Sequence, residues 1–194
     1  MSVTCPSSAQ NGDLLVLWFI QGGSGWGATV TAPSGWTNAQ QSFGNYSHTL
    51  NVAYYRISSL PAGPWTFTFS SNTLSWTGVV AAYGNLSSIT DVRDRMYFNS
   101  DTPGPVAGAD STHGGGDTWI VFEQDNCPDP GLSVTSSGTN PTKDAEGGQC
   151  SNGGPVWIGR YPHASGVDDP AFTGSGYSSS TQKALSIWFF TPQS

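Results

Sequence analysis

Charged residues are scarce in this chain, and basic residues are the scarcer kind. Only 10% of the 194 residues are charged, with six Lys or Arg against 13 Asp or Glu, for a formal net charge of −7. An acidic chain repels phosphate backbones and anionic lipid head groups, so nucleic acid and membranes are not expected partners. The lack of Lys and Glu beside abundant Gly, Ser, Thr and Asn also argues against helices, whose surfaces are rich in charge.

Long apolar runs are absent too. The run from Leu14 to Ile20 is the most apolar, and it is far shorter than the ~20 residues that a membrane-spanning helix needs. A secretory signal is not expected, because the residues before the run contain no Lys or Arg and Asp13 directly precedes it. We therefore expect a chain made in the cytoplasm without a signal peptide, and we interpret the run as a strand of the fold.

Cysteine is rare, with Cys5, Cys127 and Cys150 allowing one disulfide at most. This is not the even framework of a small secreted domain. Cys127 and Cys150 both lie in Gly- and Pro-rich sequence and can pair across it, whereas free thiols are the default in a reducing cytoplasm. The sequence favours free thiols and leaves the pairing open.

The common catalytic and cofactor motifs are missing as well. The chain has no Gly-x-Ser-x-Gly elbow, no His-x-x-x-His pair, no Cys-x-x-Cys and no Gly-Lys-Ser/Thr phosphate loop. His48, His113 and His163 stand alone in polar sequence, where surface histidines are expected rather than metal ligands or general bases. We therefore predict a protein that is not an enzyme and has no cofactor and no metal. A glycosidase is a weaker candidate, since no carboxylate pair can be nominated without the strand register.

Strand patterns are plentiful. In "PWTFTFS" (64–70) the aromatic residues Trp65, Phe67 and Phe69 alternate with threonine, which is the period of a half-buried strand. Five further short β-branched or aromatic runs are bounded by turn residues, so we predict an all-β protein. The one helical candidate is a single turn around "SSITDVRDRM" (87–96), for which an extended connection is an equal alternative. The five runs are "LNVAYYRIS", "WTGVVAAYG", "GDTWIVFEQ", "GPVWIGRY" and "KALSIWFF".

The chain also contains an internal repeat in its sequence pattern. The run "GDLLVLWFIQ" that begins at Gly12 returns as "GDTWIVFEQ" from Gly116. Such self-similarity is the sequence signature of a duplicated structural unit. Three matches share one common offset, namely Asp13 with Asp117, Val52 with Val156, and Arg56 with Arg160.

A unit of about four strands has an apolar face that it cannot cover alone, so two copies are expected to pack face to face around one core. We therefore predict one domain, residues 1–194, forming a single β-sandwich of jelly-roll type from two similar halves. The repeat spans about 10–90 and 114–192, and the segment 91–113 connects the halves. The run "GDLLVLWFI" is predicted to be a central strand covered on both faces, because it is uninterruptedly apolar.

Aromatic residues suggest two kinds of contact with other molecules. In "KALSIWFF" bulky apolar groups point both ways, so Trp188 and Phe190 are candidates for an interface with another chain, unless a loop covers that face. Trp26 and Trp36 lie in Gly-, Pro- and Ser-rich sequence. A Trp ring presented from a loop is used in sugar binding, so both are candidate glycan contacts, the alternative being that each plugs an end of the sandwich.

Several segments together carry a resemblance to a known family. The segments "GDLLVLWFIQGG", "TAPSGWT", "VAYYRIS", "PAGPWTFTFSS" and "GVVAAYGN" occur in that order over roughly residues 10–90. This order resembles a β-sandwich domain of tailed-bacteriophage structural proteins and related bacterial surface proteins. The most specific elements are the Gly-Asp-Leu-Leu opening, "PSGWT" from Pro33 to Thr37, and Tyr55-Arg56 before the Thr-Phe-Thr strand. The second half shares the resemblance only through the internal repeat.

The resemblance implies a non-enzymatic virion component, with no catalytic residues to transfer. We expect a capsid decoration (cement or head) protein that is located in the virion and stabilises the particle through contacts with the major capsid protein or other virion proteins. It also implies a homo-oligomer, such as a trimer on a capsid three-fold position. The alternative is a fibre or receptor-binding module, or a carbohydrate-binding, lectin-like module.

Overall fold

The structure is a computed structural model, and the part of the chain that it describes is all-β. No helix occurs among the described residues, as predicted, so that part contains no helix able to span a membrane. The described backbone comprises residues 1–22, 28–42, 48–70, 75–84, 86–98, 106–107, 118–125, 133–136, 142–147, 156–161, 171–175 and 183–192. Side chains are described for residues 1–19, 28–38, 51–70, 78–84, 86, 142–147 and 158–160.

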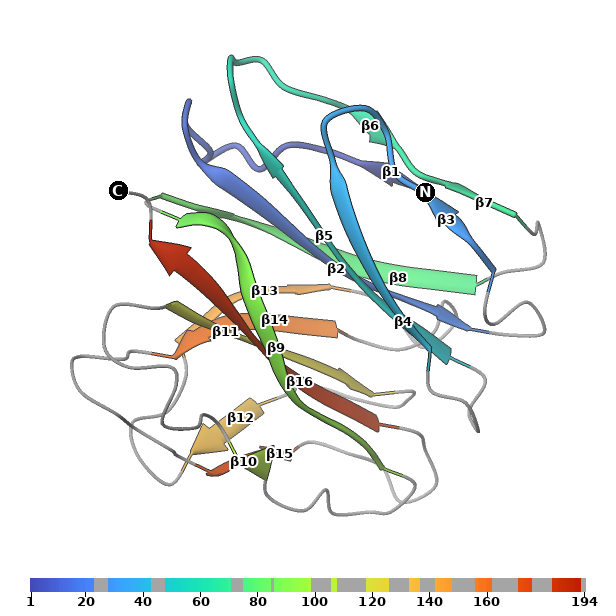
Figure 1. The fold of residues 1–194 in the computed structure, drawn as a ribbon, viewed down its shortest axis with the longest axis vertical. Helices are drawn as coiled ribbons and strands as arrows, with labels where there is room; N and C mark the ends of the chain where they lie inside the picture. Colours follow the sequence, from blue (N-terminus) through green and yellow to red (C-terminus); the bar gives the residue numbers. More distant parts are fainter. Residues whose placement is uncertain are drawn as a thin grey trace.

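The described strands form two larger antiparallel sheets and three small ones (Figure 1). The strands of the first half are β1 (Ser2–Val3), β2 (Leu14–Gly22), β3 (Val30–Thr31), β4 (Thr37–Ser42), β5 (His48–Arg56), β6 (Trp65–Thr66), β7 (Thr68–Phe69) and β8 (Ser75–Tyr83). Those of the second half are β9 (Leu86–Phe98), β10 (Val106–Ala107), β11 (Thr118–Asp125), β12 (Ser133–Ser136), β13 (Thr142–Gly147), β14 (Val156–Tyr161), β15 (Ala171–Ser175) and β16 (Lys183–Pro192).

The two larger sheets have corresponding strand orders. The first is β4-β5-β2-β8, and the second is β13-β14-β11-β16 with β9 added beside β16. Figure 1 shows these sheets one above the other, with the short strands β1, β3, β6 and β7 beyond the first sheet and β10, β12 and β15 beyond the second. This order is what the predicted repeat would produce, while the repeat boundaries and the single-domain organisation stay predictions.

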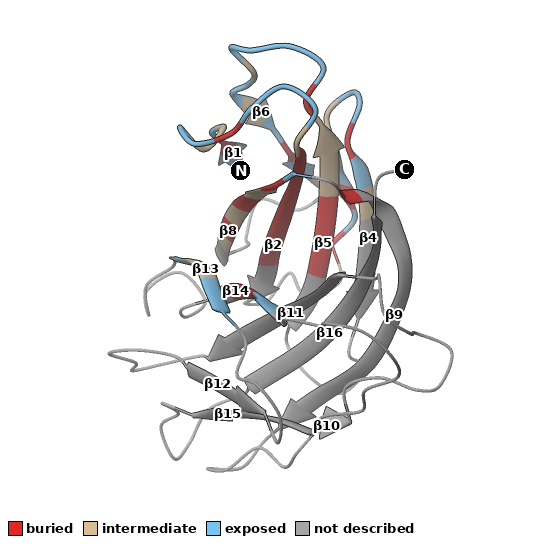
Figure 2. Ribbon diagram, turned by 90° about the vertical axis from the view of Figure 1, so that its left-hand side faces the viewer, coloured by how far each residue is buried: buried red, intermediate tan, exposed pale blue. Residues whose placement is uncertain are grey.

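Strand β2 is buried on both of its faces, which confirms the prediction made from its continuous apolar sequence. It lies between β5 and β8, and its side chains from Leu14 to Phe19 are at most 2% exposed (Figure 2). Leu15, Leu17 and Phe19 belong to a core cluster with Val30 and Phe67 from the short strand segments of the same half. Part of the described core therefore lies within the first half, between its larger sheet and its short strands. The prediction of one core formed where the two halves pack face to face did not include this layer.

The opening "NGD" forms the turn and bulge that start β2. The Asp13 amide donates to the Gln10 carbonyl over 3.2 Å, and Gly12 has a φ of 91°, the geometry of a type II turn with glycine in third place. The Gly12 amide donates to the Ile57 carbonyl, and the Ile57 amide donates to the Asp13 carbonyl, each over 2.9 Å. Gly12 and Asp13 therefore lie together opposite the single residue Ile57, which is the geometry of a β-bulge whose first residue is a glycine in the left-handed conformation.

Arg56 fastens this bulge to the connection between the halves. Its Nη1 donates to the Gly12 carbonyl over 2.6 Å, and its Nη2 donates to the Leu86 carbonyl at the start of β9. Charged donors make stronger hydrogen bonds than neutral ones. One guanidinium thus joins the start of β2 to the start of the strand that leaves for the second sheet.

The motif "PSGW" is a second turn with a glycine requirement. The Trp36 amide donates to the Pro33 carbonyl over 3.1 Å, and Gly35 has a φ of 85°. A Cβ at Gly35 would lie 2.8 Å from Cε2 of Tyr55, closer than such atoms approach. Both the backbone conformation and the neighbouring ring therefore require glycine here.

Residues 87–96, where the sequence allowed a helical turn or an extended connection, are extended. They belong to β9, which pairs antiparallel with β16 from Leu86 opposite Pro192 to Phe98 opposite Lys183, with three register shifts. The extended alternative is therefore the one that the fold adopts. A local sequence pattern cannot predict this pairing, because β16 lies about a hundred residues later in the chain.

The two turn glycines lead to a paired prediction. Gly12→Ala should lower the free energy of unfolding by about 1–2 kcal/mol, the cost of a left-handed L-residue, because a Cβ there meets no atom within 4 Å. Gly35→Ala carries the same backbone cost plus about 1–3 kcal/mol for overpacking against Tyr55. Urea unfolding of both variants measures the difference, and equal losses would show that the Tyr55 ring moves aside freely.

Candidate functional site

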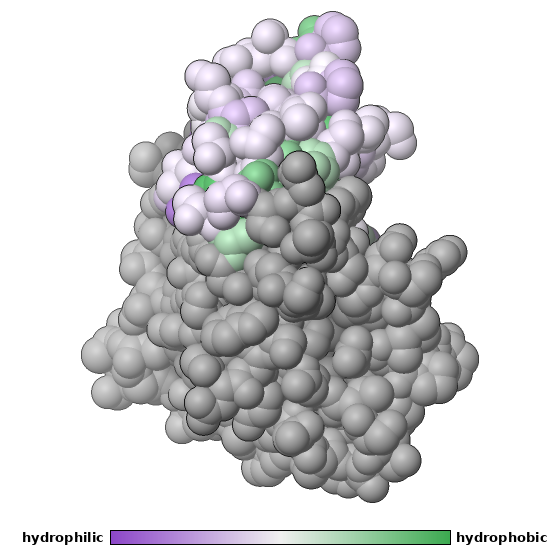
Figure 3. Space-filling model, turned by 90° about the vertical axis from the view of Figure 1, so that its right-hand side faces the viewer, coloured by the Kyte–Doolittle hydropathy of each residue, from purple (hydrophilic) through white to green (hydrophobic). Residues whose placement is uncertain are grey.

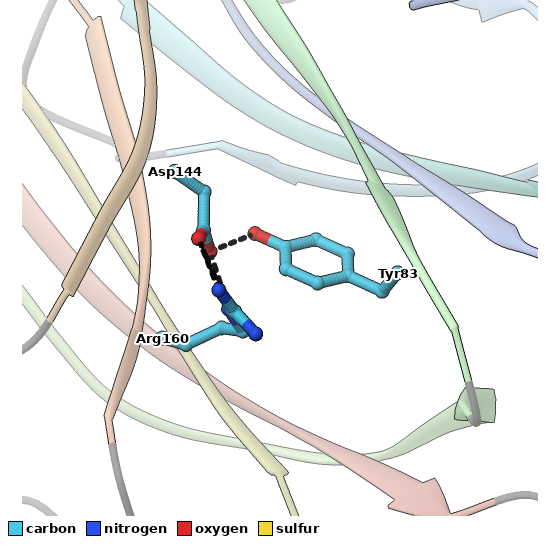
Figure 4. A network of polar contacts seen from close by, with 3 residues as sticks. All are labelled: Tyr83, Asp144 and Arg160. Atoms are coloured by element: carbon cyan, nitrogen blue, oxygen red, sulfur yellow. Dashed lines mark hydrogen bonds and ion pairs between the residues drawn. The ribbon is translucent and has the colours of Figure 1, made fainter. Parts of the chain in front are cut away.

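The most distinctive polar cluster joins the two larger sheets. It consists of Tyr83 at the end of β8, Asp144 on β13 and Arg160 on β14 (Figure 4). The Tyr83 hydroxyl donates to Asp144 Oδ2 over 2.9 Å, and Arg160 Nε lies 3.0 Å from each carboxylate oxygen. Arg160 Nη2 lies 2.9 Å from Asp144 Oδ1, so the guanidinium and the carboxylate pair side by side. One carboxylate therefore holds groups from two different strands.

Burial sets the electrostatics of this cluster. Tyr83 is 4% exposed, and desolvation, followed by the neighbouring Asp144 carboxylate, raises the pKa of its phenol well above the ordinary value. The Asp144 side chain is 12% exposed, whereas that of Arg160 is 51% exposed and lies at the rim. The hydrogen bond to Asp144 raises the pKa of Arg160. Tyr83 is thus held protonated as a donor, and Arg160 remains a cation.

A hollow of about 480 Å³ adjoins the cluster. Consecutive β8 residues from Val80 to Tyr83 line one side, Pro6 and Ser8 of the N-terminal segment line another, and Asp144 and Arg160 close the far side. Side chains alternate between the faces of a strand, so four consecutive lining residues mean that the hollow follows the edge of β8. It is a groove beside a strand and not a pit within one face of the sheet.

The cluster of Tyr83, Asp144 and Arg160 acts as a fixed polar link between the two sheets, and we call it the clamp. Both Asp144 oxygens already accept hydrogen bonds, and the neutral Tyr83 is a hydrogen-bond donor at neutral pH, so the arrangement favours fixed contacts over proton transfer. Among the described residues, no three His, Cys, Asp or Glu side chains are grouped so as to hold a metal ion. The groove offers a strand edge, small apolar side chains and one exposed cation.

The structure places Trp36 in the core, where only one of its two sequence interpretations, the filling of the sandwich, fits its surroundings. It is 8% exposed and belongs to the first-half core cluster. Its ring stacks on Tyr55 with centroids 5.5 Å apart, and it meets Trp65 and Phe67 edge-on at 5.3 and 5.2 Å. No ring face is left for a sugar, so the alternative that Trp36 fills the interior is the one that its surroundings support.

The other predicted contact residues are described less fully. Trp26 lies outside the described residues. Trp188 and Phe190 are described as backbone only, on β16 between β11 and β9, where Trp188 pairs with Ile120 and Val92. Their role in an interface stays a prediction. Figure 3 shows that the coloured part of the first half is mostly pale to purple on this side, with small separate green areas.

Of the three cysteines, the described one is a free thiol. Cys5 is partly buried, and burial together with the nearby Asp13 carboxylate raises its pKa, which lowers its reactivity. Cys127 and Cys150 lie outside the described residues, so the question of their pairing is unchanged. Cys5 also borders a shallow apolar hollow of about 590 Å³ with Leu60 and Pro64.

Sequence reasoning did not identify the cluster of Tyr83, Asp144 and Arg160. Its members come from three strands in two sheets, and no local spacing connects them. One signal pointed in this direction: Arg160 matches Arg56 in the repeat. Both arginines hold contacts between the halves. Arg56 donates to main-chain carbonyls at the connection, and Arg160 donates to the Asp144 carboxylate, which also accepts a hydrogen bond from Tyr83.

Comparison with known protein families, curated proteins and solved structures finds no match to this chain.

The clamp leads to a stability prediction. Tyr83→Phe removes a buried hydrogen bond to a carboxylate and should lower the free energy of unfolding by about 1.5–3 kcal/mol. Tyr55→Phe is the matched control, because among the described residues its hydroxyl has no hydrogen-bond partner, and it should lose far less. Denaturant unfolding of Tyr83→Phe, Asp144→Asn and the double variant gives the coupling energy. Additive losses would mean that Tyr83 and Asp144 do not act together.

The raised pKa of Tyr83 predicts a loss of stability in alkali. In the unfolded chain a tyrosine ionises near pH 10, whereas folded Tyr83 keeps its proton to higher pH, so the folded state binds more protons above about pH 10. This contribution is constant below the unfolded pKa and declines as the pH rises toward the folded one. The difference in unfolding free energy between the parent and Tyr83→Phe should therefore shrink between about pH 9 and 12. A constant difference over this range would contradict the assignment.

Proposed function

We propose that this protein is a non-enzymatic structural component of a bacteriophage virion, most specifically a capsid decoration protein. The observation that carries the proposal is the ordered resemblance over residues 10–90. Its most specific elements fall on residues that build the scaffold: Gly12 in the turn before β2, Gly35 in the turn before β4, and Arg56 at the connection between halves. A family signature made of backbone-shaping residues suits a protein whose task is to keep a shape.

The physical character of the chain supports the same proposal. Both larger sheets are antiparallel, β2 is covered on both faces, and a partly buried clamp joins the sheets, which suits a rigid module outside a host cell. We propose that the sheets form a β-sandwich of jelly-roll type from two similar halves. The net charge of −7 would keep such a protein away from packaged DNA.

The proposed partners are the major capsid protein or other virion proteins, with the chain itself as a homo-oligomer, such as a trimer at a three-fold position. Trp188 and Phe190 on β16 are the proposed contact residues. A fibre or receptor-binding module is the alternative within the same class. The glycan-binding alternative is weakened, because Trp36, one of its two candidate residues, is buried.

The copy number in purified particles tests the proposal. Quantitative mass spectrometry against the major shell protein should find hundreds of copies of this chain per particle. A few tens or fewer would favour a fibre or tail module over decoration. No copies at all would refute the virion assignment, and a glycan array with Trp26→Ala as control would then be the relevant measurement.

A further inference from the structure

The two larger sheets differ at one corresponding edge. In the second sheet, β16 is covered by β9, an antiparallel strand that pairs with it from end to end. In the first sheet, the strand in the corresponding place is β8, which pairs with β2 on one side. No strand that the structure describes pairs with its other side, and Figure 2 shows β8 as the outermost strand of its sheet. Within the part of the chain that the structure describes, the edge that β9 covers in one half is therefore open in the other.

Strand β8 also lacks the features that protect sheet edges. Its sequence "SWTGVVAAY" contains no charged residue and no proline over nine residues. By contrast, the edge strand β13 contains Lys143, Asp144 and Glu146 and a register shift, and β9 contains four charged residues and three register shifts. The third edge, β4, is short and polar. Natural proteins use charge, proline and bulges to block unwanted strand pairing, and β8 has none of these.

The strand register shows which β8 groups face outward. The Ile57 amide donates to the Asp13 carbonyl. Because the direction of the main-chain groups alternates along a strand, the amide and carbonyl groups of Leu15 and Leu17 also point toward β5. Those of the intervening residues Leu14 and Val16 therefore point to β8, where their partners are Tyr83 and Ala81. The main-chain groups of Val80 and Ala82 then point away from β2, to the open side.

A groove runs along this open side. The hollow of about 480 Å³ is lined by β8 residues and enclosed by Pro6 and Ser8 on one side and by Asp144 and Arg160 on the other. Walls on both sides fit a single extended segment better than the edge of a second folded sheet. Its β8 wall of Val80, Ala81 and Ala82 suits a strand bound chiefly by its main chain.

We propose that the open edge of β8 binds an extended segment of another polypeptide chain, which adds to the first sheet as an antiparallel fifth strand in the way that β9 adds to β16. Main-chain hydrogen bonds to Val80 and Ala82 supply the affinity, as in other cases of strand addition. The proposal does not depend on the virion assignment, because it concerns the kind of segment bound and not its source.

A peptide with the sequence of β9, residues 86–98, is the probe. Titrated into the ¹⁵N-labelled full chain, it should cause saturable shifts of the Val80 and Ala82 amides and slow their hydrogen exchange, while leaving Leu15 and Leu17 unchanged. The control is the same peptide with its backbone amides from Ser88 to Asp94 N-methylated, which keeps composition and charge but removes the donors. It should bind at least about tenfold more weakly, because several main-chain hydrogen bonds are lost.

Two proline variants test the assigned direction of the amides in the protein itself. Ala82→Pro removes an outward donor and should keep the fold while weakening peptide binding at least about tenfold. Ala81→Pro removes a donor that faces β2 and should unfold the first half. If Ala82→Pro also fails to fold, the methylated peptide decides the question with the unaltered protein.

Three results would overturn the proposal. The first is that the β9 peptide leaves the Val80 and Ala82 amides unaffected at saturating concentration. The second is that the methylated peptide binds equally well, which would show that side chains carry the contact. The third is that these amides become protected with increasing protein concentration alone, which would show that the edge pairs with a second copy of the chain.

Discussion

The fold depends on covering both faces of β2. Its uninterrupted apolar side chains require one layer on each side, and the chain supplies them from different places. Short strand segments of the same half cover Leu15, Leu17 and Phe19, and the second sheet lies on the other side, with β14 packed against β2 and both β13 and β14 against β8. A fully buried side chain of this size contributes about 1.5–3 kcal/mol, so the second half is part of what keeps β2 folded.

Two strand glycines lie where another backbone or side chain comes very close, one between the sheets and one within the first sheet. A Cβ on Gly147 of β13 would lie 3.2 Å from the carbonyl oxygen of Gly78 on β8. A Cβ on Gly78 would lie 2.8 Å from Cβ of Phe19 on β2. Strand glycines commonly mark close backbone approach: Gly147 does so where the halves meet, and Gly78 does so within the first sheet, where it lies opposite Phe19. The clamp of Tyr83, Asp144 and Arg160 adds polar contacts between β8 of the first sheet and β13 and β14 of the second.

Local pattern was enough to predict much of this fold. The all-β class, the course of β2, β5 and β8, and the two-sided burial of β2 followed from period and composition. The course of β9 did not, because its partner β16 lies far away along the chain. The sequence left Trp36 open between a glycan contact and a filler of the sandwich for a related reason: its turn sequence is typical of a loop, whereas the stacking of Tyr55 on its ring is a tertiary contact. The clamp escaped prediction because three strands of two sheets assemble it.

The double attachment of β9 has a mechanical consequence. Its first residue is held in the first half by the bond from Arg56 to the Leu86 carbonyl, and its length is paired with β16 in the second. A force that pulls the halves apart therefore acts lengthwise along β9 and loads its hydrogen bonds in shear. Ladders loaded in shear must break many bonds at once, whereas peeled ladders break them one at a time. The joint between the halves is thereby built to resist tension.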